Sequence, residues 1–323
     1  LIQREVIYGK RFNCKGGNEK CDRCCDISVI ELDGKKYPFG GACNRYYNLR
    51  RNVKYDVKRL DLIRVRQDLV FNKYGTDPIR GGHRSRKRIG FNRSFFINTY
   101  YPLFANFFAE LGCSPVIARN LSQKGIDHRN AAFCYPAELS HGFFDALLNQ
   151  EDAPEFLFLP HFKSMPTQTA GTCSQVCPLA QGETFYLQTT FRERLNEMKA
   201  NGTRLFDPLI DLTEGLHKAR QPLIETARRM GFSLRMARPA FEKALLQQQR
   251  CQSEMYACGK KTLEKLRSIP DRIGIVLFGR PYNAFVEEAH MGIPHKLASR
   301  GVQVIPLDFL PINDAPAKRH MYW

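Results

Sequence analysis

Two cysteines, each followed closely by a proline, are the residues of this 323-residue chain best suited to chemistry. Cys134 opens the stretch CYPAELSHG, and Cys177 is followed directly by a proline in GTCSQVCPLAQG. Proline suits the first turn of a helix, where its missing N–H costs no hydrogen bond. Both thiols are therefore predicted to lie at helix starts, where free amides and the helix dipole favour the thiolate that binds metals.

Other side chains close to these cysteines are candidates for the same site. Glu138 and His141 are three residues apart, hence on one helix face, and we expect them to face the cavity next to Cys134. Cys173 and Cys177 have the C-x3-C-P spacing that closes a bacterial ferredoxin run, although the preceding C-x2-C-x2-C is absent. The alternative is that a free cysteine only fills apolar space. We adopt that interpretation for Cys113, Cys251 and Cys258.

Residues 1–80 form a second region rich in cysteine and in basic residues. Its spacing, C-x6-C-x2-C-C-x17-C, predicts a four-thiolate site for zinc or an iron–sulfur cluster at Cys14, Cys21, Cys24 and Cys43. Only one C-x2-C pair is present, so reduced surface thiols are the alternative. The chain has 11 cysteines and no secretion signal, which favours metal ligation over disulfides.

The net charge of +17 is concentrated at the N-terminal end. Residues 1–88 contain 22 Lys and Arg against 10 Asp and Glu. Such a basic surface could bind an acidic partner, a phosphate-bearing ligand or nucleic acid, or it could simply be exposed to solvent. Nucleic acid is the least favoured, because the aromatic residues do not alternate with the basic ones as a base-stacking surface requires.

The order of expected elements predicts an α/β fold. Residues 26–41 are predicted to form a hairpin turning at Asp33-Gly34, and residues 53–75 to be helical. Strands and helices then alternate over 88–185, where EFLFLPHF is apolar enough for a strand buried on both faces. A mostly helical connector over 186–268 precedes the start of a similar unit at 269–323. We therefore expect two related, doubly wound parallel-sheet units behind a small cysteine-rich N-terminal region.

The loop FGRPYN offers two further candidates for cofactor binding. Arg280 lies where a buried strand should end, the place at which α/β folds bind anions, and Tyr282 lies in the same loop. The chain contains no phosphate-binding G-x-x-x-x-G-K-[ST] loop, no G-x-G-x-x-G and no G-x-S-x-G. Any nucleotide hydrolysis must therefore come from another domain.

No apolar run is long enough to span a membrane, so we expect a cytoplasmic protein. The chain begins without Met and ends at KRHMYW, which suggests a fragment of a longer protein.

Several stretches resemble one protein family: INTYYPLFANFFAELG, CYPAELSHG, FLFLPHF, CPLAQG, FGRPYNAFVEEAHMGIPHKLASRGVQVIPLDFLP and the terminal MYW. They are similar to the activase-related proteins of the 2-hydroxyacyl-CoA dehydratase system, which carry a CoA-enzyme-activase domain of uncharacterised function. The resemblance runs from about Phe39 to Trp323 and is strongest over 88–182 and 272–323.

The resemblance implies iron–sulfur electron transfer in an anaerobic system. The family cysteines correspond to Cys134 and Cys177, which would bind a cluster of 4Fe-4S type. An ATPase (activase) domain of the same or a neighbouring chain would be the partner and a dehydratase the acceptor; a homodimer is one arrangement open to the chain. Any catalysis would belong to an ATP-dependent iron–sulfur reductase system. The competing hypothesis is a zinc-stabilised scaffold or partner-docking domain without catalytic activity.

Overall fold

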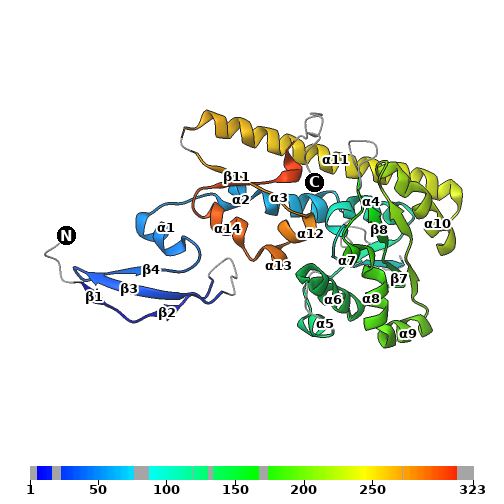
Figure 1. The fold of residues 1–323 in the computed structure, drawn as a ribbon, viewed down its shortest axis with the longest axis horizontal. Helices are drawn as coiled ribbons and strands as arrows, with labels where there is room; N and C mark the ends of the chain where they lie inside the picture. The colour runs from blue at the N-terminus through cyan, green and yellow to red at the C-terminus, as the bar shows by residue number, and fades with distance from the viewer. Residues whose placement is uncertain are drawn as a thin grey trace.

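The computed structural model describes residues 6–16, 23–75, 87–118, 120–129, 134–166, 174–270 and 272–310. The protein has a mixed α/β fold with parallel sheets, as the sequence predicts. A small N-terminal sheet lies apart from a larger body of helices and strands, and the longest helix runs along one side of that body (Figure 1).

The N-terminal sheet is antiparallel and is built around one long strand. β3 (Asp26–Leu32) pairs with three shorter strands, β1 (Ile7–Tyr8), β2 (Phe12–Asn13) and β4 (Lys35–Phe39). The turn between β3 and β4 contains Asp33 (φ 51°) and Gly34 (φ 74°), the two left-handed positions of a tight hairpin turn. The predicted hairpin is therefore confirmed.

The helical stretch predicted over residues 53–75 is also present. The elements here are α2 (Val57–Leu60), α3 (Leu62–Asp68) and the π-helical η2 (Leu69–Lys73), and α1 (Arg45–Arg51) precedes them. Arg66 of α3 is fully buried, and a buried guanidinium needs polar partners. It donates hydrogen bonds to Asp308 Oδ2 (2.6 Å) and to the carbonyl oxygen of Asn98 (2.9 Å). Through these bonds α3 joins the C-terminal residues to the central unit.

Four parallel strands form the central sheet in the order β6-β5-β7-β9. Their bounds are β5 (Arg88–Phe91), β6 (Ser114–Ile117), β7 (Phe156–Phe158) and β9 (Arg204–Phe206). Strand side chains alternate between the two faces, so Phe156 and Phe158 pack into one apolar core and Leu157 into another. The sheet is thus buried on both faces, as the apolar sequence of its strands predicts.

Helices cover both faces of this sheet. On the Phe158 side lie α4 (Ile97–Glu110) and α11 (Leu234–Ser268); on the Leu157 side lie α6 (Tyr135–Leu148), α8 (Glu183–Thr190) and α9 (Arg192–Ala200). Two shorter helices, α5 (Gln123–Asp127) and α7 (Pro178–Gln181), complete the unit. In the larger core the rings of Phe91, Phe104 and Phe108 surround Phe158, with centroids 5.1–5.6 Å from it.

The interval 186–268, predicted as a mostly helical connector, contains two strands besides its helices. The helices are η3 (Leu216–Ala219), α10 (Arg220–Met230), α9 and α11. β9 belongs to the central sheet, and β10 (Leu209–Asp211) pairs in parallel with β8 (His161–Ser164). Pro160 and Pro208 lack the N–H of a ladder hydrogen bond, so they separate these two strand pairs. The predicted third strand is therefore two short strands, β7 and β8.

The C-terminal residues form a smaller parallel pair. β11 (Gly274–Leu277) and β12 (Gln303–Pro306) are connected through α12 (Pro281–Ala284), α13 (Glu287–His290) and α14 (Ile293–Ala298), and η4 (Leu307–Phe309) follows. This strand–helix–strand order is the one predicted for the start of a second α/β unit. The full repeat of the doubly wound unit stays a prediction.

The long helix α11 packs closely on the elements beside it. A Cβ at Gly259 would collide with the backbone oxygen of Phe309 in η4, so glycine permits this approach. In the described part of the chain, no helix is both long and apolar enough to cross a membrane.

Candidate functional site

Three helices begin directly after an extended residue and carry a proline in their first two positions. Cys134 precedes α6, Cys177 precedes α7 and Arg280 precedes α12. None of these three side chains makes a capping hydrogen bond to its own helix. The two thiols are therefore not consumed by satisfying the N–H groups at the helix starts.

Tyr282 is a buried residue that lies within electrostatic reach of both cysteines. It is 5% exposed, and its ring packs edge-on against Phe95 and Phe96, with centroids 5.0 and 5.3 Å away. Arg280 Nη1 donates a hydrogen bond to its hydroxyl oxygen (3.2 Å). Burial raises the pKa of Tyr282, the hydrogen bond and positive charge of Arg280 offset part of that rise, and negative charge at Cys177 and Cys134 adds a smaller rise.

Arg280 contacts Cys177 as well as Tyr282. The hydrogen bond to Tyr282 is the main cause that raises the pKa of Arg280, and a hydrogen bond to the Cys177 thiol adds to it. A fixed positive charge therefore lies next to one of the two thiols.

Tyr186 of α8 is the second aromatic neighbour that the cysteines share. Its pKa is raised first by burial and then by negative charge at Glu183, Cys134 and Cys177. The ring of His141 stacks on it, with centroids 5.1 Å apart and planes 10° from parallel. Charge at Cys134 and charge at Cys177 thus act on the same two tyrosines.

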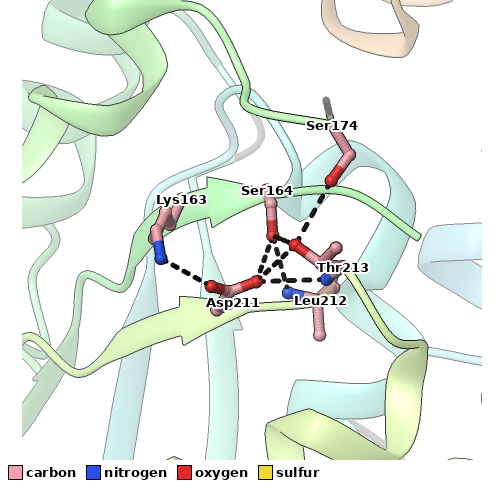
Figure 2. Close-up of polar contacts among 6 residues, drawn as sticks. All are labelled: Lys163, Ser164, Ser174, Asp211, Leu212 and Thr213. Atoms are coloured by element: carbon pink, nitrogen blue, oxygen red, sulfur yellow. Dashed lines mark hydrogen bonds and ion pairs between the residues drawn. The ribbon is translucent and has the colours of Figure 1, made fainter. Parts of the chain in front are cut away.

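A polar cluster at the ends of β8 and β10 holds the segment that leads to Cys177 (Figure 2). Asp211 accepts hydrogen bonds from Lys163 Nζ (2.8 Å), Thr213 Oγ1 (2.7 Å) and the Ser164 hydroxyl. These donors, Lys163 first, hold the pKa of Asp211 well below its usual range. The carboxylate therefore stays ionised and keeps its three partners in place.

The same cluster extends to the backbone before Cys177. Ser174 Oγ donates to Thr213 Oγ1 (3.3 Å), as Figure 2 shows. The Val176 N–H donates to the carbonyl oxygen of Lys163 (3.0 Å), so the segment runs along β8. Cys177 is thereby carried on backbone that is bonded to a strand of the central unit.

Glu183, the first residue of α8, is a buried carboxyl between three elements. Its Oε1 accepts hydrogen bonds from Asn92 Nδ2 (2.9 Å), Ser140 Oγ (2.7 Å) and the Ser94 hydroxyl. Burial raises the pKa of Glu183, and the three donors offset part of that effect. The contacts fix α6, which Cys134 precedes, against α8, the second helix after Cys177.

Glu138 and His141, expected to face the cavity next to Cys134, have partners of their own. Glu138 Oε2 pairs with Arg129 Nε (3.2 Å). His141 is 8% exposed; its Nδ1 lies 2.8 Å from the carbonyl oxygen of Ala137 and its Nε2 lies 3.4 Å from Thr190 Oγ1. Burial lowers the pKa of His141 and so favours the neutral ring. Both side chains are engaged in contacts that stabilise α6 and its neighbours.

The residues of this site lie in a stretch of the chain that matches a known protein family. Residues 88–310 match the CoA enzyme activase uncharacterised domain. The chain belongs to this family. No curated protein and no solved structure matches it. The family domain begins at β5 and includes Cys134, Cys177, Arg280 and Tyr282, whereas the N-terminal sheet precedes it.

Two of the N-terminal cysteines outside the family domain, Cys14 and Cys43, interact with one tyrosine, Tyr46. The Cys14 N–H donates to the carbonyl oxygen of Cys25 across the sheet (2.8 Å). A hydrogen bond with Tyr46 is the main cause that lowers the pKa of Cys14, and the same contact, with a smaller effect of Cys43, raises the pKa of Tyr46. Cys24 is exposed and has a left-handed backbone (φ 44°).

These four thiols line one hollow of about 1840 Å³ between the N-terminal sheet and the helices α1, α3 and α13. Cys21 and Cys173, two of the predicted ligands, lie outside the described residues. Within the described ranges, no group of three or more His, Cys, Asp or Glu side chains is arranged to hold a metal ion.

Three further cysteines of the domain lie in or against the main core, as a structural role requires. Cys113 and Cys251 are buried, and burial raises their pKa to about 11 and about 12. Cys258 packs against the same core from α11.

Sequence reasoning missed three residues of these sites: Glu183, Tyr186 and Cys25. The signal for Glu183 was its place at a helix start after Gly182, but a glutamate there is usually solvated. Its burial depends on Ser94 and Ser140, which are distant in sequence. Cys25 was passed over in favour of Cys24, although its partner across the sheet is Cys14.

Proposed function

We propose that the family domain of this chain is an iron–sulfur electron-transfer module of an acyl-CoA dehydratase activase system. Cys134 and Cys177 would hold a 4Fe-4S cluster, and an ATP-driven activase domain would deliver the electron. The observation that carries the proposal is that both thiols stand at helix starts and that charge at each of them acts on the same two tyrosines.

The residues around the two thiols suit such a group. Thiolates are the ligands of iron–sulfur clusters, and neither thiol caps its own helix. Arg280 supplies positive charge and N–H donors beside Cys177, which favours an anionic sulfur. Two thiolates are half of a four-thiolate set, so we expect the two remaining ligands from Cys173 together with a second chain, or both from a second chain.

A bound cluster would supply one-electron chemistry at low potential. The chain's own residues bind and orient it: the polar cluster around Asp211 fixes the approach to Cys177, and the contacts of Glu183 fix the helix of Cys134. The buried ring of Tyr282, packed on Phe95 and Phe96, limits access of water from the side of the core.

Anaerobic reconstitution of the full chain with iron and sulfide tests the proposal. We expect bound iron, acid-labile sulfide and a broad visible absorption that bleaches on reduction. C134S and C177S should each lower bound iron several-fold, whereas C258S, which changes a thiol of α11, should not. An iron-free wild-type chain, or equal iron in all three variants, would overturn the proposal.

A second candidate, a zinc-stabilised scaffold that docks a partner, rests on the N-terminal sheet. Cys14 forms a hydrogen bond with Tyr46, charge at Cys43 also acts on Tyr46, and Cys25 faces Cys14 across the strands. Zinc would bind three or four of the N-terminal thiols as thiolates. The excess of Lys and Arg in residues 1–88 would then favour an acidic partner surface.

Metal analysis separates the two candidates. About one zinc per chain with no iron, lost in C14S and C43S but kept in C134S, would favour the scaffold. Zinc retained in C14S and C43S would exclude the N-terminal thiols as its ligands.

A further inference from the structure

Cys14 and Cys25 lie opposite each other on two strands of the N-terminal sheet. β2 pairs antiparallel with β3, and Asn13 lies opposite Asp26. The same register sets Cys14 opposite Cys25, and the Cys14 N–H donates to the carbonyl oxygen of Cys25 (2.8 Å). We infer that these two thiols form a reversible disulfide, which makes the sheet a redox-sensitive site. The pair depends on neither metal site proposed above.

Both side chains leave their strands on the same face of the sheet, because opposite residues of an antiparallel pair share one face. The next pair along the strands, Phe12 and Ile27, shows which face this is. The ring of Phe12 packs edge-on against Tyr46 of α1, with centroids 5.7 Å apart, and Ile27 is buried. A Cβ added at Gly41, just before α1, would lie 3.6 Å from the Cβ of Cys25. The two thiols therefore lie under α1 and the loop that leads to it.

The spacing of the two strands permits a disulfide but does not favour a relaxed one. Opposite residues joined by a ladder hydrogen bond have Cα atoms about 5.5 Å apart, within the roughly 4.4–6.8 Å that a disulfide spans. Their Cβ atoms are about 4.5–5.5 Å apart, whereas a disulfide needs about 3.5–4.5 Å. Closing the bond must therefore draw the strands together. Strained disulfides are easily reduced, so we expect a bond that forms on oxidation and opens in excess thiol.

Cys14 is the better placed of the two to attack a disulfide. A hydrogen bond with Tyr46 is the main cause that lowers its pKa, and a backbone hydrogen bond with Gly16 and the charge of Arg45 act in the same direction. The thiolate is the attacking form of cysteine. Cys14 and Cys25 are half-buried and line the hollow between the N-terminal sheet and α1, so a small disulfide can reach them.

The oxidant is a small disulfide such as oxidised glutathione. The Cys14 thiolate attacks one of its sulfurs, a mixed disulfide forms, and one glutathione thiolate leaves. Cys25 loses its proton and attacks the Cys14 sulfur, and the second glutathione thiolate leaves. Two protein thiols are thereby oxidised to one disulfide, one glutathione disulfide is reduced to two thiols, and the two protons pass to the departing thiolates.

The closed bond has a direct consequence for metal binding. Zinc binds cysteine as the thiolate, which a disulfide no longer provides. Oxidation of Cys14 and Cys25 and binding of a metal by the same two sulfurs therefore exclude each other. Any zinc that these thiols hold should leave the chain as the bond forms.

The test is a peptide map of the full chain as purified, equilibrated with mixtures of oxidised and reduced glutathione before free thiols are blocked. Trypsin places the candidate cysteines on separate peptides: Cys14 in 12–15, Cys24 and Cys25 in 24–35, and Cys43 in 37–45. Mass spectrometry should find 12–15 linked to 24–35 as the main oxidised species, and excess reduced glutathione should remove the link. In strong denaturant the preference should disappear, because it comes from the paired strands. A link mainly between 12–15 and 37–45, or no preference in the folded chain, overturns the inference.

Matched variants decide which thiol of peptide 24–35 takes part. C25S should lower the link to 12–15 at least tenfold, whereas C24S, which changes the exposed neighbour, should keep it. Loss of the link in C24S, or its full retention in C25S, assigns the bond to Cys24 and overturns the inference. The C24S result and the wild-type map decide the question even if C25S fails to fold.

Y46F tests the attacking role of Cys14. Without the Tyr46 hydroxyl, less of Cys14 is thiolate at neutral pH, so the link should form several-fold more slowly than in the wild type. The difference should shrink at alkaline pH, where the thiolate prevails in both chains. Equal rates at neutral pH would show that Cys14 is not the attacking thiol and would overturn that step.

Discussion

The N-terminal sheet and the central α/β unit both carry cysteines, but they hold them by different means. Among the described residues of the N-terminal 52, Ile27 is the only large apolar side chain that is buried. In the central unit, Phe91, Phe104, Phe108 and Phe158 are all fully buried in one core. Packing of buried apolar side chains therefore fixes the positions of Cys134 and Cys177. The same packing contributes little to the positions of Cys14, Cys25 and Cys43.

The difference indicates what each region needs in order to fold. A packed core fixes helix starts before any ligand arrives, so the central cysteines are positioned by the protein itself. A four-stranded antiparallel sheet with one buried side chain has too little core to be stable alone, and small domains of this kind commonly depend on a metal.

The largest expected effect belongs to the zinc scaffold proposed as the second candidate, in which the N-terminal thiols would hold a metal that a chelator removes. Structural zinc contributes roughly 10–16 kcal/mol in small zinc domains. Treatment with a strong chelator should therefore unfold the N-terminal sheet and leave the central unit folded. Limited proteolysis checks this: new cleavage should appear within residues 6–52 while 88–310 stays protected. Unchanged protection would mean that the sheet is stable without metal.

Next comes a cavity in the central core. Phe158→Ala should lower the free energy of unfolding by about 3–5 kcal/mol, because a fully buried ring is removed from a tightly packed aromatic cluster. Urea denaturation measures the change. Ile27→Ala is the matched variant and should leave this main transition in place. An equal shift for both variants would show that the two regions unfold as one.

Glu183 should make the stability of the central unit dependent on pH. Because burial raises its pKa in the folded state, the folded chain binds more protons than the unfolded chain above about pH 4.3. Its stabilising contribution is full below that pH and is lost as pH rises, by up to about 1.4 kcal/mol per unit. Urea denaturation at pH 5 and 7 should show this slope in the wild type and a flatter one in E183Q. If the free energy of unfolding changed equally with pH in the wild type and in E183Q, the pH dependence would not come from Glu183.

The smallest effects are those at two turns, one in each region. Gly34→Ala and Gly202→Ala each place a side chain at positive φ, 74° and 94°, with no atom nearby to clash. The cost of each is therefore backbone strain alone, about 1–2 kcal/mol. Thermal unfolding should show it in the main transition for Gly202→Ala and only in the N-terminal sheet for Gly34→Ala. A shift of the main transition by Gly34→Ala, or of the N-terminal sheet by Gly202→Ala, would argue against two separately unfolding regions.

Local sequence was sufficient for several features of the fold. Asp33-Gly34 predicts the hairpin turn, because these residue types tolerate left-handed backbone. Pro136 and Pro178 predict the two helix starts that follow Cys134 and Cys177, since proline favours those positions. The parallel α/β character follows from the apolar strands alternating with helices, and the resemblance to the CoA enzyme activase family predicted the match over 88–310.

Other features depended on partners distant in the chain. The strands β9 and β10 lie within an interval of helical composition, and they exist because β7 and β8 offer them edges to pair with. Glu183 became a buried carboxyl only because Asn92, Ser94 and Ser140 surround it.

The sequence alone thus determined which residues begin helices, which turn and which carry thiols, since neighbouring backbone and side chains decide these. Only the tertiary structure decided that Cys134, Cys177 and Arg280 share the surroundings of Tyr282. The physical reason is that such proximity arises from packing helices against one sheet, and the shapes of many distant side chains determine that packing together.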